Sequence, residues 1–141
     1  MTIPLPCPIS GSAMSSEVTS RPLLLLVEDE TFLAATLCES LAGQFEVEVA
    51  GNVAEARMLL GLRKFDLILS DHMLPGRHQG LDFLMEALQL QPGAKRILMT
   101  GYLNPELLAR SSSLAQLSAC LVKPVEISRL RKELDEALGR R

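Results

Sequence analysis

The sequence predicts an α/β fold in which a five-stranded parallel sheet is covered by helices on both faces. Short apolar runs of strand length alternate five times with stretches of helical periodicity. The first run, at residues 23–27, is apolar throughout, as is typical of a strand buried on both faces. A length of 141 residues suits one domain rather than two, and a hydrophobic share of 48% allows a sizeable core.

The remaining strands are predicted from equally short runs. Residues 46–50 alternate polar and apolar side chains, which favours a position near an edge of the sheet. The third, fourth and fifth strands are the apolar runs at 67–70, 97–99 and 120–122. Right-handed crossovers are expected between parallel strands of this kind.

Five helices are predicted from apolar positions that recur every three or four residues. Asn52 can cap the second of them, because its side chain can accept from the first free backbone N–H groups. The predicted spans are 31–41, 52 to about 61, 81–90, a weakly patterned helix from about 105, and 127–138.

Residues 1–20 differ in composition from the rest of the chain. They are rich in proline and serine and hold no Lys or Arg, which predicts a flexible N-terminal tail rather than a signal peptide. The domain is therefore assigned to residues 21–141. No apolar run near the start is long enough to cross a bilayer, and the three cysteines form no Cys-x-x-Cys pair, so we expect a cytoplasmic protein.

Charge and aromatic content exclude one class of function. The net charge is -3, there is no Trp, and Tyr102 is the only Tyr. A chain of this kind has neither the basic surface nor the stacking side chains of a general nucleic-acid binder. We therefore expect no direct contact with DNA.

Chemically capable residues follow four of the five predicted strands. They are Glu28, Asp29 and Glu30 after the first, Asp71 after the third, Thr100 and Gly101 after the fourth, and Lys123 and Pro124 after the fifth. In parallel sheets the carboxyl ends of the strands form the ligand-binding edge. Carboxylates brought together there repel one another, and a divalent cation with oxygen ligands resolves the repulsion. A hydroxyl and an ammonium beside such a cation are suited to phosphoryl transfer onto a carboxylate.

This pattern resembles the receiver domain of bacterial response regulators over roughly residues 21–140. The resemblance is carried by Val27-Glu28-Asp29-Glu30, Ser70-Asp71-His72-Met73-Leu74-Pro75-Gly76, Met99-Thr100-Gly101-Tyr102 and Leu121-Val122-Lys123-Pro124. It implies a flavodoxin-like fold with strand order 2-1-3-4-5. It also implies a phosphorelay switch that is phosphorylated by a sensor histidine kinase or a histidine phosphotransfer protein.

The resemblance assigns a role to each matching residue. Asp71 matches the phosphoacceptor. Mg²⁺, or Mn²⁺ in its place, is expected to be held by Glu28, Asp29, Asp71 and the backbone carbonyl of Met73. Thr100 matches the switch hydroxyl and Lys123 the ammonium that meets the phosphoryl group. The chain is then no enzyme in the usual sense, beyond Mg²⁺-dependent self-phosphorylation and autodephosphorylation.

Each of these motifs is weak when taken singly. Asp71 alone is typical of a turn before Pro75, and Lys123 before Pro124 alone indicates a loop. The functional interpretation depends on all four motifs lying at the same edge of the sheet. His72 and His78, which flank the same turn, are expected to be solvated loop residues, because no further soft ligand lies nearby.

The sequence departs from the family pattern in two places. Cys120 stands three residues before Lys123, where the family commonly has an aromatic side chain that moves inward on activation. Tyr102, in the loop after the fourth strand, is an alternative aromatic for that role. The loop after Asp71 is one residue longer than the commonest spacing, with Gly80 nine residues further on.

Several functions fit this sequence. The chain shows no output domain, so a stand-alone switch that signals through protein–protein contact, including a phosphorylation-dependent homodimer, is the first interpretation. A receiver portion of a larger response regulator or hybrid kinase is the second. An aspartate-nucleophile phosphatase would need Asp-x-Asp after the first strand, where this chain has Glu28-Asp29-Glu30. A pseudo-receiver would bind partners and accept no phosphoryl group.

Overall fold

The computed structural model describes residues 21–75, 79–102 and 104–140, and it forms one α/β layer structure. The elements in chain order are β1 (Leu23–Val27), α1 (Thr31–Leu41), β2 (Glu46–Ala50), α2 (Val53–Leu62), β3 (Leu67–Asp71), α3 (Gly80–Leu90), β4 (Lys95–Thr100), α4 (Pro105–Ser113), β5 (Ala119–Val122) and α5 (Ile127–Ala137). The predicted tail at residues 1–20 lies outside the described residues. No helix in the described part of the chain is both long and apolar enough to span a membrane.

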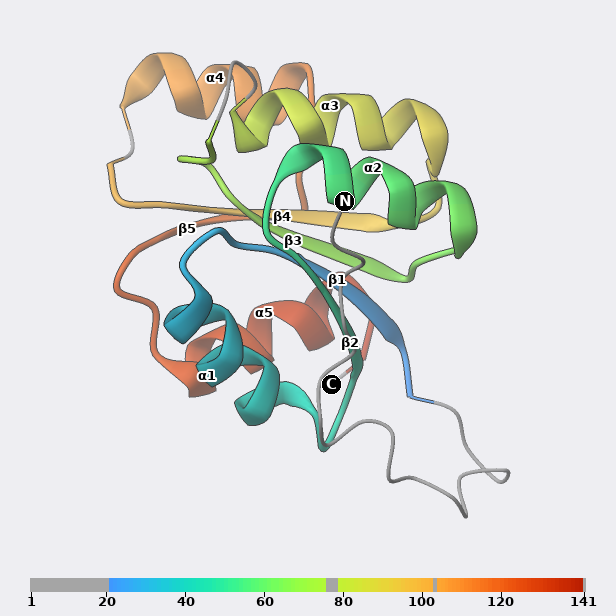
Figure 1. The fold of residues 1–141 in the computed structure, drawn as a ribbon. Coiled ribbons are helices and arrows are strands. Elements are labelled where there is room, and N and C mark those ends of the chain that lie inside the picture. The colour runs from blue at the N-terminus through green and yellow to red at the C-terminus, as the bar shows by residue number, and fades with distance from the viewer. Residues whose placement is uncertain (1–20, 76–78, 103, 141) are drawn as a thin grey trace.

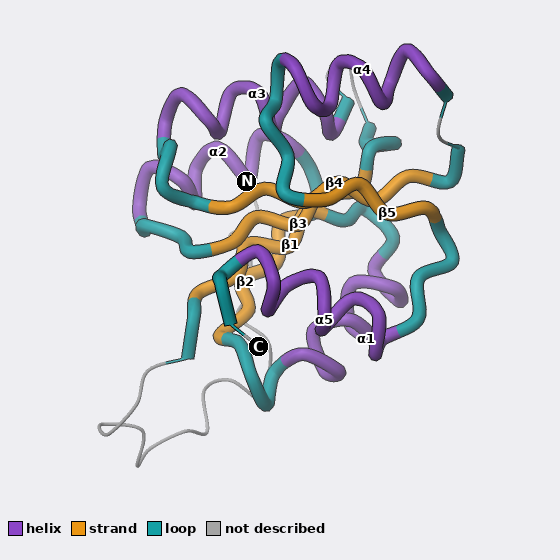
Figure 2. Tube along the Cα trace, turned by 180° about the vertical axis from the view of Figure 1, so that it is seen from behind, coloured by secondary structure: helices purple, strands orange, loops and turns teal. Residues whose placement is uncertain are grey.

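All five strands pair in parallel, in the order β2-β1-β3-β4-β5. Figure 1 shows α2, α3 and α4 on one face of this sheet and α1 and α5 on the other, and Figure 2 shows the same layers from behind. The predicted fold class and strand order are therefore confirmed. The alternating strand β2 is an edge strand, as its sequence indicated.

The apolar run of β1 divides its side chains between two cores. Leu23, Leu25 and Val27 pack in the cluster on the α2–α4 face, whereas Leu24 and Leu26 pack in the cluster beneath α1 and α5. Successive side chains of a strand point to opposite faces, so a strand between two helical layers must be apolar at every position. This requirement explains why the run shows no alternation.

The register of the strands brings the polar residues to one edge. Val27 pairs with Ser70, Asp71 with Met99, and Thr100 with Val122. Beyond the last pairs the ladder continues for one more bond, from Lys123 N to Thr100 O at 2.8 Å. The residues that follow β1, β3, β4 and β5 therefore lie at nearly the same height on the sheet.

A buried arginine fixes the connection between α4 and β5. The Arg96 guanidinium donates to the carbonyl oxygens of Ala94, Ala115 and Gln116, and the Arg96 carbonyl accepts from Ser118 N at 2.8 Å. Buried carbonyl groups need hydrogen-bond partners, and Arg96 supplies them for a turn in which Gln116 has a φ of 50°. This contact holds β5, and with it Lys123, in register beside β4.

Candidate functional site

Three carboxylates meet at the carboxyl edge of the sheet. Glu28 and Asp29 follow β1, and Asp71 ends β3. One oxygen from each lies within 4.8 Å of the others. Glu28 and Asp71 are buried, with 2% and 5% of their surface exposed, while Asp29 is open to solvent. The prediction that these three side chains lie close together is confirmed. Their roles as metal ligands stay predictions.

Burial and repulsion act on Glu28. Desolvation raises the pKa of its carboxyl group above the ordinary value, and the neighbouring Asp71 carboxylate raises it further. A hydrogen bond from Glu30 N to Glu28 Oε2 at 3.3 Å and the Lys123 ammonium offset part of this shift. Ionisation of both Glu28 and Asp71 therefore costs free energy, and a bound cation can offset this cost.

Lys123 supplies one cation to this edge. Its Nζ lies 3.2 Å from Asp71 Oδ1 and 3.4 Å from Glu28 Oε1. Partial burial lowers the pKa of Lys123, but the two carboxylates more than compensate, so its pKa is raised overall. The ammonium is therefore charged at neutral pH. The Lys123–Pro124 peptide bond is cis.

Thr100 is buried at the end of β4, with 2% of its surface exposed. Its hydroxyl group donates to Tyr102 O at 2.9 Å and accepts from Tyr102 N at 3.2 Å. Thr100, the switch residue predicted from the sequence, thus lies at the same edge of the sheet as the acidic cluster, and its hydroxyl group forms two hydrogen bonds within its own loop.

Gly80 lies directly against the backbone of Asp71. A methyl group on its Cα would come within 2.0 Å of Asp71 O and 2.8 Å of the Asp71 carbonyl carbon. Gly80 N also donates to His72 O at 2.7 Å. The start of α3 therefore packs directly against the backbone of Asp71, and only glycine leaves the space for this contact. The sequence analysis used Gly80 only to measure the loop and missed this contact.

The expectation of a solvated histidine is wrong for His72. The ring is half-buried, and its Nδ1 accepts from Leu81 N at 3.3 Å at the start of α3. Burial lowers its pKa. The signal was its place between Asp71 and a helix start, where free N–H groups need an acceptor. His78 lies outside the described residues.

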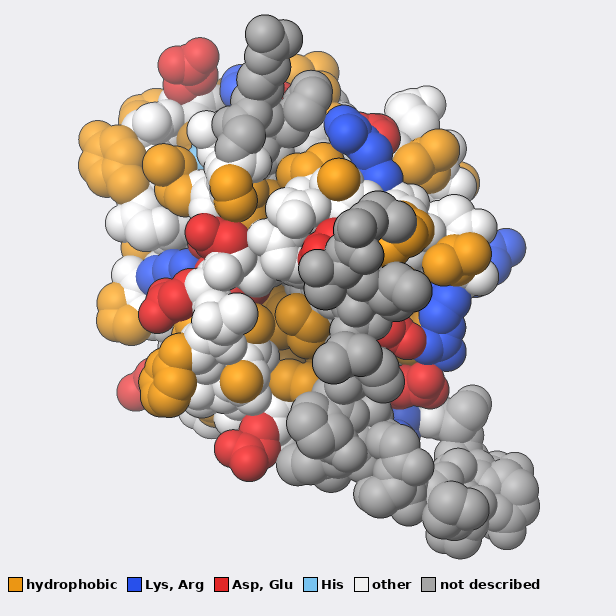
Figure 3. Space-filling view, in the orientation of Figure 1, with side chains coloured by type: hydrophobic (Ala, Val, Ile, Leu, Met, Phe, Trp, Pro, Cys, Tyr) orange, Lys and Arg blue, Asp and Glu red, His pale blue; other side chains and the backbone are white. Residues whose placement is uncertain are grey.

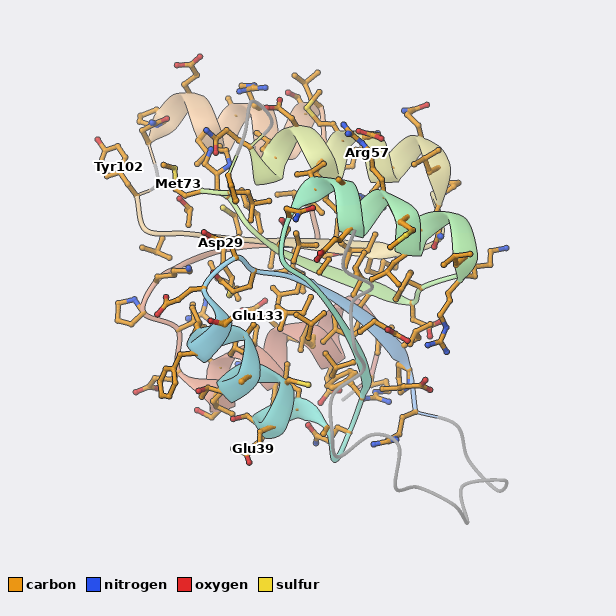
Figure 4. All side chains as sticks on the ribbon, in the orientation of Figure 1. Asp29, Glu39, Arg57, Met73, Tyr102 and Glu133 are labelled. Atoms are coloured by element: carbon orange, nitrogen blue, oxygen red, sulfur yellow. The ribbon has the colours of Figure 1, made fainter. Side chains whose placement is uncertain are left out.

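The donor set fits a small hard cation. Carboxylate oxygens from Glu28, Asp29 and Asp71 fill part of a coordination shell and leave places for water or phosphate oxygens, which is the arrangement that Mg²⁺ favours. Met73 lies two residues after Asp71 with its side chain exposed, and the role of its carbonyl as a ligand stays a prediction. Figure 4 shows Asp29, Met73 and Tyr102 on the same side of the molecule, at the edge where the strands end.

Comparison with known proteins identifies the family. The family model for the response regulator receiver domain matches residues 24–135. The chain belongs to this receiver family. Its fold is shared with the receiver domain protein of Methanospirillum hungatei, with a TM-score of 0.80 and 31% identity over 85% of this chain and 95% of that one.

Curated relatives include longer regulators that contain a receiver domain. The response regulator PilR of Pseudomonas aeruginosa is 33% identical over 84% of this chain and 26% of its own length. The transcriptional regulatory protein DpiA of Escherichia coli is 33% identical over 83% of this chain and 52% of its own length. The receiver domain described here thus spans about a quarter to a half of these two relatives. Its role is that of a phosphoacceptor in two-component signalling.

One related structure contains a modified aspartic acid and a metal ion. The response regulator from Burkholderia pseudomallei, with a TM-score of 0.75 and 26% identity over 84% of this chain and 69% of that one, contains a phosphorylated aspartic acid, a calcium ion and citrate.

Proposed function

We propose that Asp71 is the phosphoacceptor of this receiver domain and that it takes the phosphoryl group from a phosphohistidine on a sensor kinase or phosphotransfer protein. The observation that carries the proposal is the contact of Lys123 Nζ with Asp71 Oδ1 at 3.2 Å, inside a cluster of three carboxylates. A buried carboxylate that pairs with an ammonium and lies near two further carboxylates able to hold a cation is equipped to become an acyl phosphate. The phosphorylated aspartic acid of the Burkholderia relative supports the same assignment.

The reaction follows from the positions of the side chains. An oxygen of Asp71 attacks the phosphorus in line, and a P–O bond forms as the P–N bond to the donor imidazole breaks. The other ring nitrogen of the phosphohistidine carries a proton, so the imidazole leaves as a neutral ring. Lys123 neutralises charge on the phosphoryl oxygens as they approach Asp71. Glu28, Asp29, Asp71 and the Met73 carbonyl would hold Mg²⁺, which when bound supplies further charge neutralisation at the same oxygens. Phosphoryl transfer to Asp71 and the later hydrolysis of the acyl phosphate by water, which releases inorganic phosphate, are the reactions assigned to the chain.

To signal that Asp71 is phosphorylated, the Thr100 side chain must adopt a second conformation. A phosphoryl group on Asp71 presents new oxygen acceptors close to the buried Thr100 hydroxyl, and each charge-assisted hydrogen bond contributes roughly 1.5–3 kcal/mol. That difference is enough to shift an equilibrium between two conformations. We expect the surface formed by α4, β5 and α5 to change and to meet a downstream protein in the cytoplasm. Signalling by protein contact fits a net charge of -3.

The deciding experiment is incubation with a small phosphodonor and Mg²⁺, read by intact mass. We expect one phosphoryl adduct, stable in acid and labile in base, that is lost in Asp71→Asn. Asp135→Asn, which changes an α5 carboxylate paired with Arg140, is the matched control and should label like the wild type. An unmodified wild-type protein contradicts the proposal, and steady turnover of a phosphomonoester would favour a phosphatase.

Mg²⁺ is expected to stabilise the fold at neutral pH and to lose this effect on acidification. Because the folded-state pKa of Glu28 is raised, this group stabilises the fold below its ordinary pKa and ceases to do so as the pH rises through the raised value. A bound cation offsets this loss because it binds the ionised carboxylates. At a concentration a hundred times its Kd, it raises the free energy of unfolding by about 2.7 kcal/mol. Protons compete for the same oxygens at acidic pH.

Thermal unfolding with Mg²⁺ or with a chelator, across pH, measures this effect. Glu28→Gln should lose most of the gain. Glu39→Gln, at an exposed position of α1, should keep it. A gain of equal size at acidic and neutral pH would show that the cation binds elsewhere.

A further inference from the structure

Two exposed leucines lie at the amino edge of the sheet, at the opposite end from Asp71. Leu62 is the last residue of α2 and Leu90 is the last residue of α3, and 71% and 57% of their surfaces are exposed. Figure 1 shows α2 and α3 side by side on one face of the sheet, with both helices ending at the same edge. A single exposed leucine is common on protein surfaces, but two that share one rigid surface indicate a site of contact.

A buried glutamine makes this surface rigid, because it joins the ends of the two helices. Gln91, which follows Leu90, donates from Nε2 to Leu60 O at 2.8 Å and to Arg63 O at 2.7 Å. Its Oε1 accepts from Phe65 N at 2.8 Å. The three bonds use both amide protons and the carbonyl oxygen of the side chain. The two leucines are therefore presented on fixed backbone, and a partner that covers them does not have to order a loop first.

Two lysines stand in the turns that follow these helices. Lys64 lies two residues after Leu62, and Lys95 begins β4; both are exposed, and neither forms a salt bridge in the described part of the chain. Lys95 N donates to Asp66 O at 3.0 Å, which ties the two turns together. Figure 3 shows hydrophobic side chains next to basic ones on the side of the molecule where α2 and α3 end.

The acidic groups near these lysines have other partners. Asp66 Oδ2 accepts from Leu23 N at 2.8 Å, and both Glu46 and Glu48 pair with Arg63. The ammonium groups of the two lysines are therefore the charges on this surface that an incoming carboxylate can neutralise. A partner that covers the leucines and also carries acidic side chains is complementary to the surface in both respects.

This surface shares no residue with the site at Asp71. The strand β3 runs between the two, from Leu67, which pairs with Lys95, to Asp71. Four steps of about 3.3 Å along a strand place these two ends roughly 13 Å apart. A molecule bound over Leu62 and Leu90 therefore leaves the carboxyl edge of the sheet open to a phosphodonor.

We propose that Leu62, Lys64, Leu90 and Lys95 form a docking surface for an acidic amphipathic helix of a partner protein; we call these four residues the amino-edge surface. Apolar side chains that recur every three or four residues along such a helix cover the two leucines, and Asp or Glu side chains beside them meet the lysines. The partner stays bound whether or not Asp71 carries a phosphoryl group. This inference goes beyond the proposed function, because it assigns the chain a permanent anchor besides its switch.

A synthetic peptide of about five helical turns tests the proposal. It carries leucine at every third or fourth position, glutamate at the positions between, and a fluorescent label. Fluorescence anisotropy during titration with the full chain measures its Kd. We expect saturable binding that weakens as salt is added, because 0.1 M salt screens exposed charges beyond about 10 Å. A peptide with lysine in place of every glutamate, and one of the same composition without an apolar face, should not bind.

Variants of exposed residues assign the binding to the amino-edge surface. Leu62→Gln and Leu90→Gln should each raise the Kd by about tenfold, since each removes a leucine that the peptide buries. The double variant Lys64→Glu, Lys95→Glu should raise it at least as far and should bind the lysine peptide instead. All four positions are exposed, so these changes leave the core intact.

Control variants lie away from this surface. Phe32→Gln removes an exposed apolar side chain at the other edge of the sheet, and Lys132→Glu reverses an exposed charge on α5. Both variants, and Asp71→Asn, should bind the glutamate peptide like the wild type. The inference is overturned if the glutamate peptide does not bind, if the lysine peptide binds equally well, or if the Kd rises in Phe32→Gln rather than in Leu90→Gln. Sedimentation of the chain alone is measured alongside: self-association that is lost in Leu90→Gln would make a second copy the occupant and overturn the proposed partner.

Discussion

Gly80→Ala is expected to destabilise the fold by at least about 3 kcal/mol, at the upper end of the usual range for overpacking. The added methyl group would lie 2.0 Å from Asp71 O and 2.8 Å from His72 Cα, and both are backbone atoms that cannot rotate away. Either α3 or the end of β3 must move. Because the displaced atoms belong to Asp71, we also expect the rate of phosphoryl labelling to fall by roughly a hundredfold, as for a misplacement of about 1 Å.

A second glycine provides the matched control. Gly61 lies in α2, and nothing is within 4 Å of where its Cβ would be. Gly61→Ala should therefore stabilise the protein by about 0.5–1 kcal/mol, since alanine loses less backbone entropy in a helix. Urea unfolding and the time course of labelling compare the two variants. If Gly80→Ala unfolds and labels like Gly61→Ala, the close approach to Asp71 is not a constraint on the site.

The fold was predictable because the pattern of apolar residues in each strand indicates how many of its faces are buried. A fully apolar strand such as β1 requires a helical layer on each face, and the alternation in β2 indicates a strand at the sheet edge; both are observed. The N-terminal cap of α2 followed from local chemistry in the same way: Asn52 Oδ1 accepts from Glu55 N at 2.8 Å. The predicted strands at 67–70 and 97–99 are shorter than β3 and β4, because the polar residues Asp71, Lys95 and Thr100 pair in the sheet and lie outside the apolar runs.

The position of the site was predictable for a topological reason. Parallel strands carry their ends to one edge, so residues from four strands had to meet, and Lys123 does contact both Glu28 and Asp71. What the sequence does not show is how the loops fold back. The approach of Gly80 to Asp71 and the bonds between Thr100 and Tyr102 depend on turn geometry, and a residue list holds no measure of that geometry.

Lys123→Met is expected to slow phosphoryl transfer to Asp71 by about 10²–10³-fold, the range found when one group that stabilises developing charge is removed. The Lys123 ammonium lies within 3.4 Å of both buried carboxylates and is charged at neutral pH. Methionine keeps most of the length and apolar surface of the side chain but brings no charge. The loss should therefore appear in the rate rather than in the packing of β5.

The same substitution should strengthen the binding of Mg²⁺. Lys123 competes with the cation for the oxygens of Glu28 and Asp71, and without it these two carboxylates face each other with no neutralising side chain. Lys64→Met, which changes an exposed lysine before β3, is the control and should alter neither quantity. Titration with Mg²⁺ and the labelling rate at saturating Mg²⁺ measure the two effects separately. A damaged site would lose both metal affinity and rate, whereas tighter metal binding with slower transfer can arise only if Lys123 acts on the charge that develops at Asp71.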